Sequence, residues 1–101
     1  MELTDTSIAK EDPKLTKIAA EKVKEFQKSQ EKEGWGFRIE VLDNAGDNSY
    51  FLDFEEKPEK NDILVEAESI TMYLAPESYR FLQDKTINFV EKDGEEGFKI
   101  E

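Results

Sequence analysis

The spacing of apolar residues changes at Gly34-Trp35-Gly36, and this change most constrains what the chain can fold into. Before it, apolar residues recur every three or four positions, which is the period of an amphipathic helix. After it, apolar and polar residues alternate, which is the period of a half-buried strand. A leading helix followed by several short strands predicts an α+β fold with a mainly antiparallel sheet. We interpret the glycine pair as an element boundary inside a single domain that spans residues 1–101.

The leading helix is predicted to begin at Asp12-Pro13, with the aspartate as N-cap and the proline in the first turn. It is predicted to end before Gly34. The expected buried face consists of residues at helical spacing: Leu15, Ile18, Ala19, Val23 and Phe26.

Short strands are predicted over the rest of the chain. Residues 37–41 and 50–54 form a hairpin around the turn cluster 43–48, with Ile39 and Leu52 facing the core. Two more strands are expected at 63–65 and 70–74, and Pro76 opens a short helix with Tyr79 and Leu82 on its buried side. Ile87 and Phe89 begin another strand, and Asp93-Gly94 turns the chain toward a last one at Phe98 and Ile100.

Charge and residue types exclude several classes of function. The chain of 101 residues has a net charge of −11, and residues 34–101 contain 17 acidic and 7 basic side chains. Nucleic acid and anionic membranes would repel such a surface, so we expect neither as a partner. The absence of cysteine and histidine removes the thiolate nucleophile, the usual general base and the main zinc ligands. With no signal peptide and no apolar run of membrane-span length, we expect a soluble cytoplasmic protein.

The strand segments in their order resemble the HesB/IscA-like A-type iron-sulfur carriers. Six segments carry the resemblance: Gly36-Phe37-Arg38-Ile39, Tyr50-Phe51-Leu52-Asp53-Phe54, Asp62-Ile63-Leu64-Val65, Ser78-Tyr79-Arg80-Phe81-Leu82, Ile87-Asn88-Phe89-Val90 and Gly97-Phe98-Lys99-Ile100. Their order and spacing are kept from Gly34 to Ile100, so the resemblance spans about two thirds of the chain. The resemblance implies a pseudo-barrel or sandwich of short, mainly antiparallel strands capped by helices.

The resemblance does not extend to the ligands. Members of that family hold a cluster or iron with a cysteine in the first hairpin loop and a cysteine-glycine-cysteine motif near the C-terminus. Here the loop position falls on Gly46 or Asp47, and the sequence reaches Glu101 without the second motif. Thiolates hold clusters because sulfur is soft, and histidine is the known substitute. We therefore predict no cofactor, no catalytic residue and no inherited carrier activity.

Three other candidate sites have competing interpretations. Asp43 and Asp47 in the hairpin loop are a possible oxygen-ligand site for a divalent cation or iron, although the loop lacks the calcium-binding pattern. Asp53, Asp62 and Glu66 would serve a hydrolase only if two of them converged in one cleft. Trp35 is the aromatic residue best placed for partner contact, whereas Tyr73 and Tyr79 are expected in the core.

These observations favour a non-catalytic domain that binds a protein partner with a basic surface, as an accessory linked to iron-sulfur assembly. The alternative is a cation- or iron-binding protein that uses the acidic hairpin loop. The sequence does not predict an oligomeric state.

Overall fold

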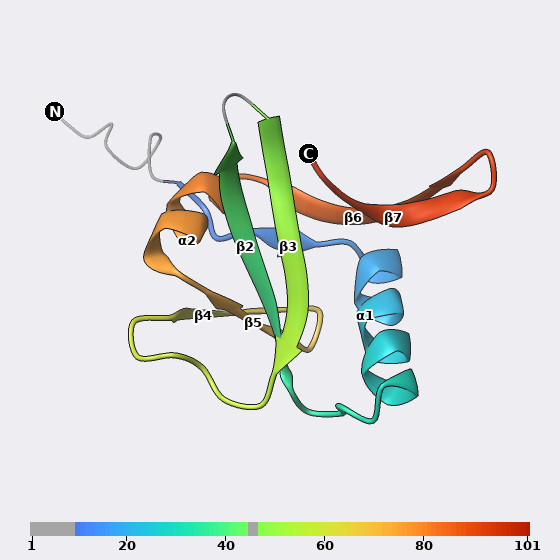
Figure 1. Cartoon of the computed structure of the whole chain (residues 1–101), viewed down its shortest axis with the longest axis horizontal. Coiled ribbons are helices and arrows are strands. Elements are labelled where there is room, and N and C mark those ends of the chain that lie inside the picture. Colours follow the sequence, from blue (N-terminus) through green and yellow to red (C-terminus); the bar gives the residue numbers. More distant parts are fainter. Residues whose placement is uncertain (1–9, 45–46) are drawn as a thin grey trace, which may run out of the picture.

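The computed structural model describes the backbone of residues 10–44 and 47–101, and the side chains of 10–42 and 50–101 (Figure 1). Two helices lie in these residues: α1 (Lys17–Ser29) and α2 (Pro76–Leu82). The strands are β1 (Lys14–Leu15), β2 (Gly36–Asn44), β3 (Asp47–Glu55), β4 (Ile63–Ala67), β5 (Ile70–Leu74), β6 (Thr86–Lys92) and β7 (Glu95–Ile100). The predicted α+β class is confirmed.

The strands form two sheets, with orders β3-β2-β5-β4 and β1-β6-β7. Three antiparallel hairpins make up most of the pairing, namely β2 with β3, β4 with β5 and β6 with β7. Two short parallel contacts, β1 with β6 and β2 with β5, complete the sheets. The prediction of mainly antiparallel strands is therefore confirmed, whereas β1 was not predicted.

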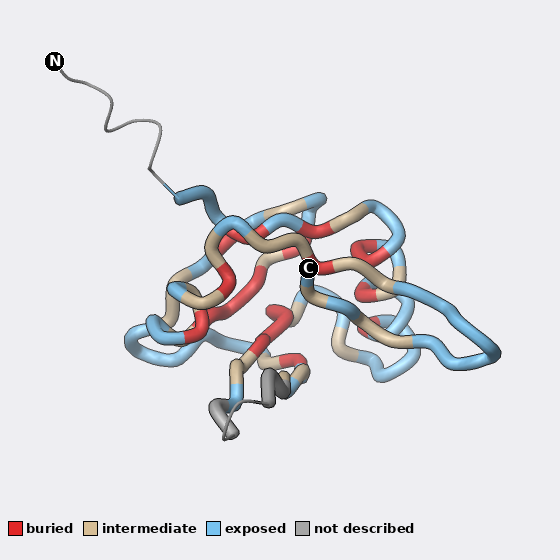
Figure 2. Tube along the Cα trace, turned by 90° about the horizontal axis from the view of Figure 1, so that it is seen from above, coloured by how far each residue is buried: buried red, intermediate tan, exposed pale blue. Residues whose placement is uncertain are grey.

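The core lies between the four-stranded sheet on one side and α1 with β6 on the other (Figures 1 and 2). Its members come from both sheets and both helices: Leu15, Ala19, Ala20, Val23, Phe37, Ile39, Phe54, Val65, Ile70, Met72, Leu74, Leu82 and Ile87. The β6–β7 hairpin extends beyond this core, and its tip is exposed (Figure 2). No helix in the described part of the chain is both long and apolar enough to cross a membrane.

The predicted start of the first helix is wrong. Residues 14–15 are extended and pair with β6, and the helix begins after Thr16, whose Oγ1 accepts a hydrogen bond from the Ala19 N–H at 3.1 Å. Strand pairing fixes the segment at both ends, because Lys14 N–H donates to Lys85 O and Thr16 N–H donates to Ile87 O. Asp12 instead accepts a hydrogen bond from the Tyr79 hydroxyl, which raises the pKa of that hydroxyl.

The buried face of α1 is rotated from the predicted one. Ala19, Ala20, Val23 and Gln27 are buried, whereas Ile18 is 44% exposed and Phe26 is 38% exposed. The two alanines allow close approach to the sheets, and Gln27 is a polar residue that the apolar pattern could not include. The helix ends before Gly34 as predicted, and Gly34 has φ +83, a conformation that favours glycine.

The β2–β3 hairpin has the predicted faces. Phe37 pairs with Phe54 and Ile39 with Leu52, so these side chains point toward the core, and Phe51 points outward. Ile39 is fully buried and Leu52 half-buried against the core. The predicted turn over 43–48 is too wide, because the pairing continues to Asn44 and Asp47. The tip, residues 45–46, lies outside the described residues.

The later elements lie where the sequence predicts them. β4 and β5 form a hairpin, α2 begins at Pro76, and β6 and β7 pair across the turn before Glu95. Leu82 is buried and Tyr79 half-buried on α2. Ser78, also on α2, is buried, and its Oγ accepts a hydrogen bond from the Val41 N–H at 3.1 Å, which fastens α2 to the edge of β2.

Gly36 is required by the close approach of Tyr73. A Cβ added at Gly36 would lie 2.2 Å from the Tyr73 ring carbons, while a Cβ at Gly97 would meet nothing within 4 Å. We expect Gly36→Ala to displace the buried Tyr73 ring and lower the free energy of unfolding by about 1–3 kcal/mol. Urea unfolding measures this, with Gly97→Ala as the matched control that changes little. Equal urea midpoints for the two variants would contradict the predicted packing.

Candidate functional site

The hairpin tip is where the sequence placed two candidate sites. Of the two positions predicted to align with the family cysteine, Gly46 lies outside the described residues, and so does the side chain of Asp47. The side chain of Asp43 also lies outside them. The oxygen-ligand hypothesis for these aspartates therefore stays a prediction. Elsewhere, the described side chains include no group of three or more histidine, cysteine, aspartate or glutamate residues placed to hold a metal ion.

The most buried charge among the described residues is the guanidinium of Arg38 on β2. Its side chain and that of Asp62 are each 3% exposed. Arg38 donates from Nη1 to Asp62 Oδ1 at 3.2 Å and from Nη2 to Asp62 Oδ2, which is the bidentate geometry of a strong pair. Its Nε lies 2.9 Å from Glu55 Oε1, a close ion pair without the alignment of a hydrogen bond. Glu59 lies farther away, 3.8 Å from Nη2.

The acids around Arg38 hold it in the charged form. Burial lowers the pKa of the guanidinium, but the hydrogen bonds to Asp62 and the negative charges of Asp62 and Glu55 outweigh burial and keep that pKa above its ordinary value. Asp62 also accepts a hydrogen bond from the Glu59 N–H at 2.6 Å. This cluster therefore fastens the segment between β3 and β4 onto β2, and we assign it a structural role.

The three carboxylates considered for hydrolysis have different partners. Asp62 binds Arg38, Asp53 accepts a hydrogen bond from the Phe54 N–H at 2.8 Å, and Glu66 accepts one from Thr71 Oγ1 at 3.4 Å. None of these hydrogen bonds joins one of the three acids to another. The described side chains thus give no support to an acid pair.

Trp35 is half-buried, so only part of it is accessible to a partner. It packs against the core, and Lys32 Nζ lies 5.3 Å from the centroid of its ring. Its backbone oxygen accepts a hydrogen bond from Gln27 Nε2 at 2.7 Å. Part of Trp35 lines a surface hollow of about 180 Å³ together with Lys24 and Thr71. Its predicted role in partner contact stays a prediction.

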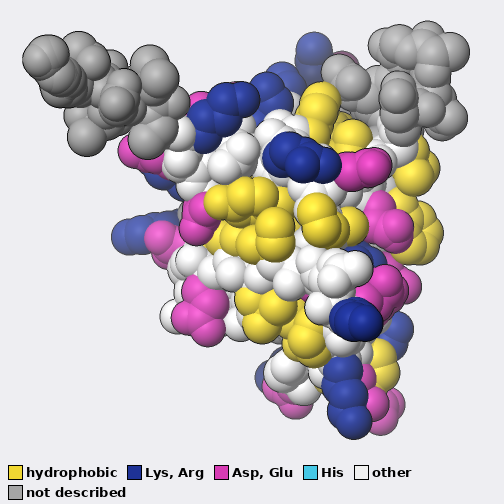
Figure 3. Space-filling model, turned by 90° about the vertical axis from the view of Figure 1, so that its left-hand side faces the viewer, with side chains coloured by type: hydrophobic (Ala, Val, Ile, Leu, Met, Phe, Trp, Pro, Cys, Tyr) yellow, Lys and Arg dark blue, Asp and Glu magenta, His cyan; other side chains and the backbone are white. Residues whose placement is uncertain are grey.

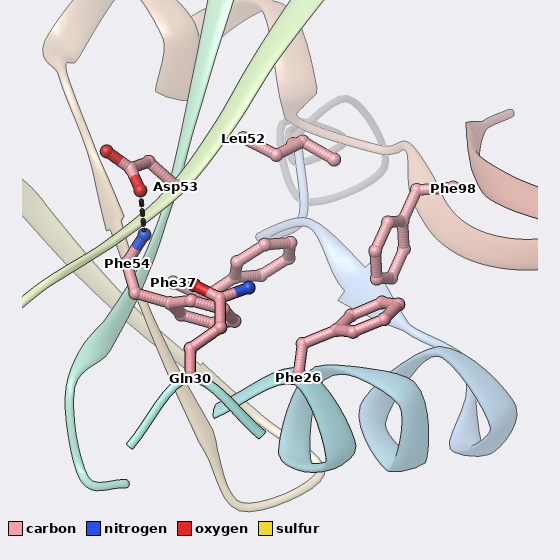
Figure 4. Close-up of a pocket in the computed structure, with 7 residues that line it drawn as sticks. All are labelled: Phe26, Gln30, Phe37, Leu52, Asp53, Phe54 and Phe98. Atoms are coloured by element: carbon pink, nitrogen blue, oxygen red, sulfur yellow. Dashed lines mark hydrogen bonds between the residues drawn. The ribbon is translucent and has the colours of Figure 1, made fainter. Parts of the chain in front are cut away.

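The structure places an apolar cleft where no sequence motif predicted one (Figure 4). It encloses about 140 Å³, and its lining comes from α1, the residue after it, and strands β2, β3 and β7: Phe26, Gln30, Phe37, Leu52, Asp53, Phe54 and Phe98. The rings are in contact, with centroids 6.2 Å apart for Phe26 and Phe98 and 5.5 Å apart for Phe37 and Phe98. The sequence offered one weak signal, its seven phenylalanines, but nothing that brought them together.

The face of the four-stranded sheet that points away from the cleft carries scattered apolar residues. Figure 3 shows hydrophobic side chains on this side of the molecule in separate groups among acidic and basic ones. Leu42, Phe51 and Leu64 are exposed on its strands. The cleft in Figure 4 differs because its apolar side chains converge on one space.

Comparison of the chain with known proteins identifies its family. Residues 14–101 match the family model described as iron-sulphur cluster biosynthesis. The chain therefore belongs to this family, and the resemblance to the HesB/IscA-like A-type proteins is confirmed. A search of curated proteins found no match.

Solved structures with the same fold include three relatives of low sequence identity. Escherichia coli SufA, described as involved in biosynthesis of iron-sulfur clusters, is 24% identical with a TM-score of 0.75, over 100% of this chain and 95% of that one. IscA with the [2Fe-2S] cluster is 23% identical with a TM-score of 0.75, over 88% and 83%. A protein from Aquifex aeolicus is 21% identical with a TM-score of 0.72, over 100% and 98%. These structures support the fold alone.

The donor set of this chain does not fit an iron-sulfur cluster. Its 101 residues include no cysteine and no histidine. Clusters are held by thiolates, with imidazole as the known substitute. Of the described carboxylates, Asp62 and Glu55 are already paired with Arg38. The family fold is thus present without the ligand types that a cluster needs.

Proposed function

We propose that this chain is a non-catalytic member of the iron-sulphur cluster biosynthesis family that binds a protein partner as an accessory to assembly. The observation that carries the proposal is a family match over residues 14–101 in a chain with no thiol and no imidazole. Without the ligand residues the fold still presents a surface, and binding is the activity that a surface alone can support. We also propose that residues 1–101 form one domain and that the protein is cytoplasmic.

The charge of the chain supports a partner with a basic surface. Residues 34–101, which include all the strands after α1, hold 17 acidic and 7 basic side chains. Such a field speeds encounter with a basic protein and disfavours nucleic acid and anionic lipid. Screening shortens the reach of this field from about 10 Å at 0.1 M salt to about 3 Å at 1 M.

A pull-down from extract of the native cells, with the chain as bait, tests this proposal. At 0.1 M salt we expect at least one basic protein to be recovered, with no enrichment of DNA or RNA, and at 1 M salt we expect its recovery to fall severalfold. Polyglutamate added as competitor controls for binding to negative charge alone. If nothing is recovered at low salt, the acidity serves only solubility. Equal recovery of the partner at both salt concentrations would show that apolar residues, Trp35 first among them, make the contact in place of the acidic ones.

A further inference from the structure

β3 presents an unpaired edge. It is the last strand in the order β3-β2-β5-β4, and no described residue pairs with its second side. Phe54 N–H donates a hydrogen bond to the Asp53 carboxylate, which places the Phe54 backbone on the free side of β3. Val41, which pairs with Tyr50, likewise donates its N–H away from β3, to Ser78. Because alternate residues of an antiparallel strand share a side, the N–H and C=O groups of Tyr50, Leu52 and Phe54 face the free edge.

The apolar cleft reaches this edge. Leu52, Asp53 and Phe54 are consecutive on β3, and all three line the cleft. Because side chains of a strand alternate between two faces, three consecutive residues can line one cleft only where it opens at the edge of the strand. Figure 4 shows Leu52 and Phe54 pointing toward Phe26 and Phe98, with Asp53 on the other side of the strand. The volume of about 140 Å³ is close to that of a cavity known to hold benzene, so one large apolar side chain fits.

Beside Leu52 and Phe54, the other face of β3 carries acidic residues. Asp53 and Glu55 alternate with the cleft-facing residues. Glu55 is paired with Arg38, while Asp53 is 2.8 Å from the Phe54 N–H that it covers. A cationic side chain arriving beside β3 would give the Asp53 carboxylate a charged partner and release that N–H for strand pairing.

We propose that β3 binds an extended basic segment of a partner protein by strand addition. The segment alternates apolar and basic residues: the apolar ones face Leu52 and Phe54, with one in the cleft, and a lysine or arginine pairs with Asp53. Main-chain hydrogen bonds to a sheet edge supply affinity in this mode, and alternate side chains supply specificity. The inference deepens the proposed function and rests on it.

Charge complementarity selects this occupant over a second copy of the chain. Two β3 edges paired with each other would bring Asp53 and Glu55 of one copy near the same acids of the other, between molecules that each have a net charge of −11. Like charges opposite one another destabilise a strand pair.

The test uses a seven-residue probe, acetyl-Lys-Val-Lys-Phe-Lys-Val-Lys-amide, titrated at 0.1 M salt into the isotopically labelled 101-residue chain. We expect the largest amide shifts at Tyr50, Leu52 and Phe54. A peptide of the same composition with its apolar residues adjacent, Lys-Lys-Lys-Lys-Val-Phe-Val, controls for charge, and a backbone N-methylated probe controls for strand pairing. Both should bind at least about fivefold more weakly.

Two variants and their matched controls locate the site. Phe26→Ala removes a cleft wall, and Ile18→Ala removes a similarly exposed side chain elsewhere on α1. Asp53→Asn removes the proposed cation partner, and Glu77→Gln removes an exposed acid on α2. We expect Phe26→Ala and Asp53→Asn to weaken probe binding at least about fivefold, and each control less than twofold. The amide spectrum of each variant verifies folding.

Failure of this site is distinguishable from failure of the proposed function. Equal binding of probe and rearranged peptide, shifts away from β3, or equal effects of Phe26→Ala and Ile18→Ala would overturn the site. If the Phe26→Ala and Asp53→Asn baits recover the same cellular partner as the unaltered chain, the partner binds elsewhere, and the proposed function stands without this site.

Discussion

Arg38→Met is expected to lower the free energy of unfolding by about 3–5 kcal/mol, a large part of the roughly 5–15 kcal/mol typical of a domain. The reason is that the substitution leaves buried carboxylates without their cation. Asp62, with its side chain 3% exposed, would lose both guanidinium hydrogen bonds, and Glu55 would lose its cation. Urea unfolding followed by fluorescence of the single tryptophan measures the change.

Two comparisons make this prediction specific to the buried pair. The double variant Arg38→Met with Asp62→Asn removes the unpaired charge, so we expect it to be more stable than Arg38→Met alone. Lys22→Met breaks the more exposed pair in which Lys22 Nζ lies 3.6 Å from Glu25, and should cost at most about 1 kcal/mol. An Arg38→Met variant no less stable than Lys22→Met would show that the cluster contributes little to stability.

Ile39→Ala is expected to cost about 2–5 kcal/mol, because Ile39 is fully buried in the core and its truncation leaves a cavity. Leu52→Ala should cost less, since Leu52 is half-buried and faces the cleft. Leu64→Ala, at a site 54% exposed, is the control and should change stability by about 0.5 kcal/mol or less. Similar urea midpoints for Ile39→Ala and Leu64→Ala would disprove the placement of Ile39 in the core.

Local patterns predicted the elements that depend on local interactions. Alternation over residues 37–41 and 50–54 gave the hairpin and its faces, because a strand buries every second side chain. Pro76 marked the start of α2, because its fixed φ suits the first turn. The order of the strand segments along the sequence then carried the family resemblance, and the family match over residues 14–101 agrees with it.

Features that depend on distant contacts were missed. The two residues of β1 are extended and pair with β6, so the N-cap of the helix is Thr16 and not Asp12. The burial of Gln27 depends on the carbonyl of Trp35, which no apolar period reports.

The cleft was missed for the same reason. Phe26 and Phe98 are 72 positions apart, and the hydrophobic pattern of each element is equally consistent with a closed core. Only the relative placement of α1, β3 and β7 leaves a space between them. The sequence motifs therefore indicate the family and the missing ligands, whereas the proposed binding site depends on the three-dimensional arrangement.

Anaerobic reconstitution of the 101-residue chain with iron and sulfide most directly tests whether this chain lacks the ligands to hold an iron-sulfur cluster. IscA, whose solved structure contains the [2Fe-2S] cluster, is treated in parallel as the comparison, and Asp43→Asn with Asp47→Asn identifies any weak iron bound through the hairpin carboxylates. We predict that the purified chain stays colourless, because none of its residues is a thiolate or an imidazole. Stoichiometric cluster absorbance in the reconstituted chain would contradict the account.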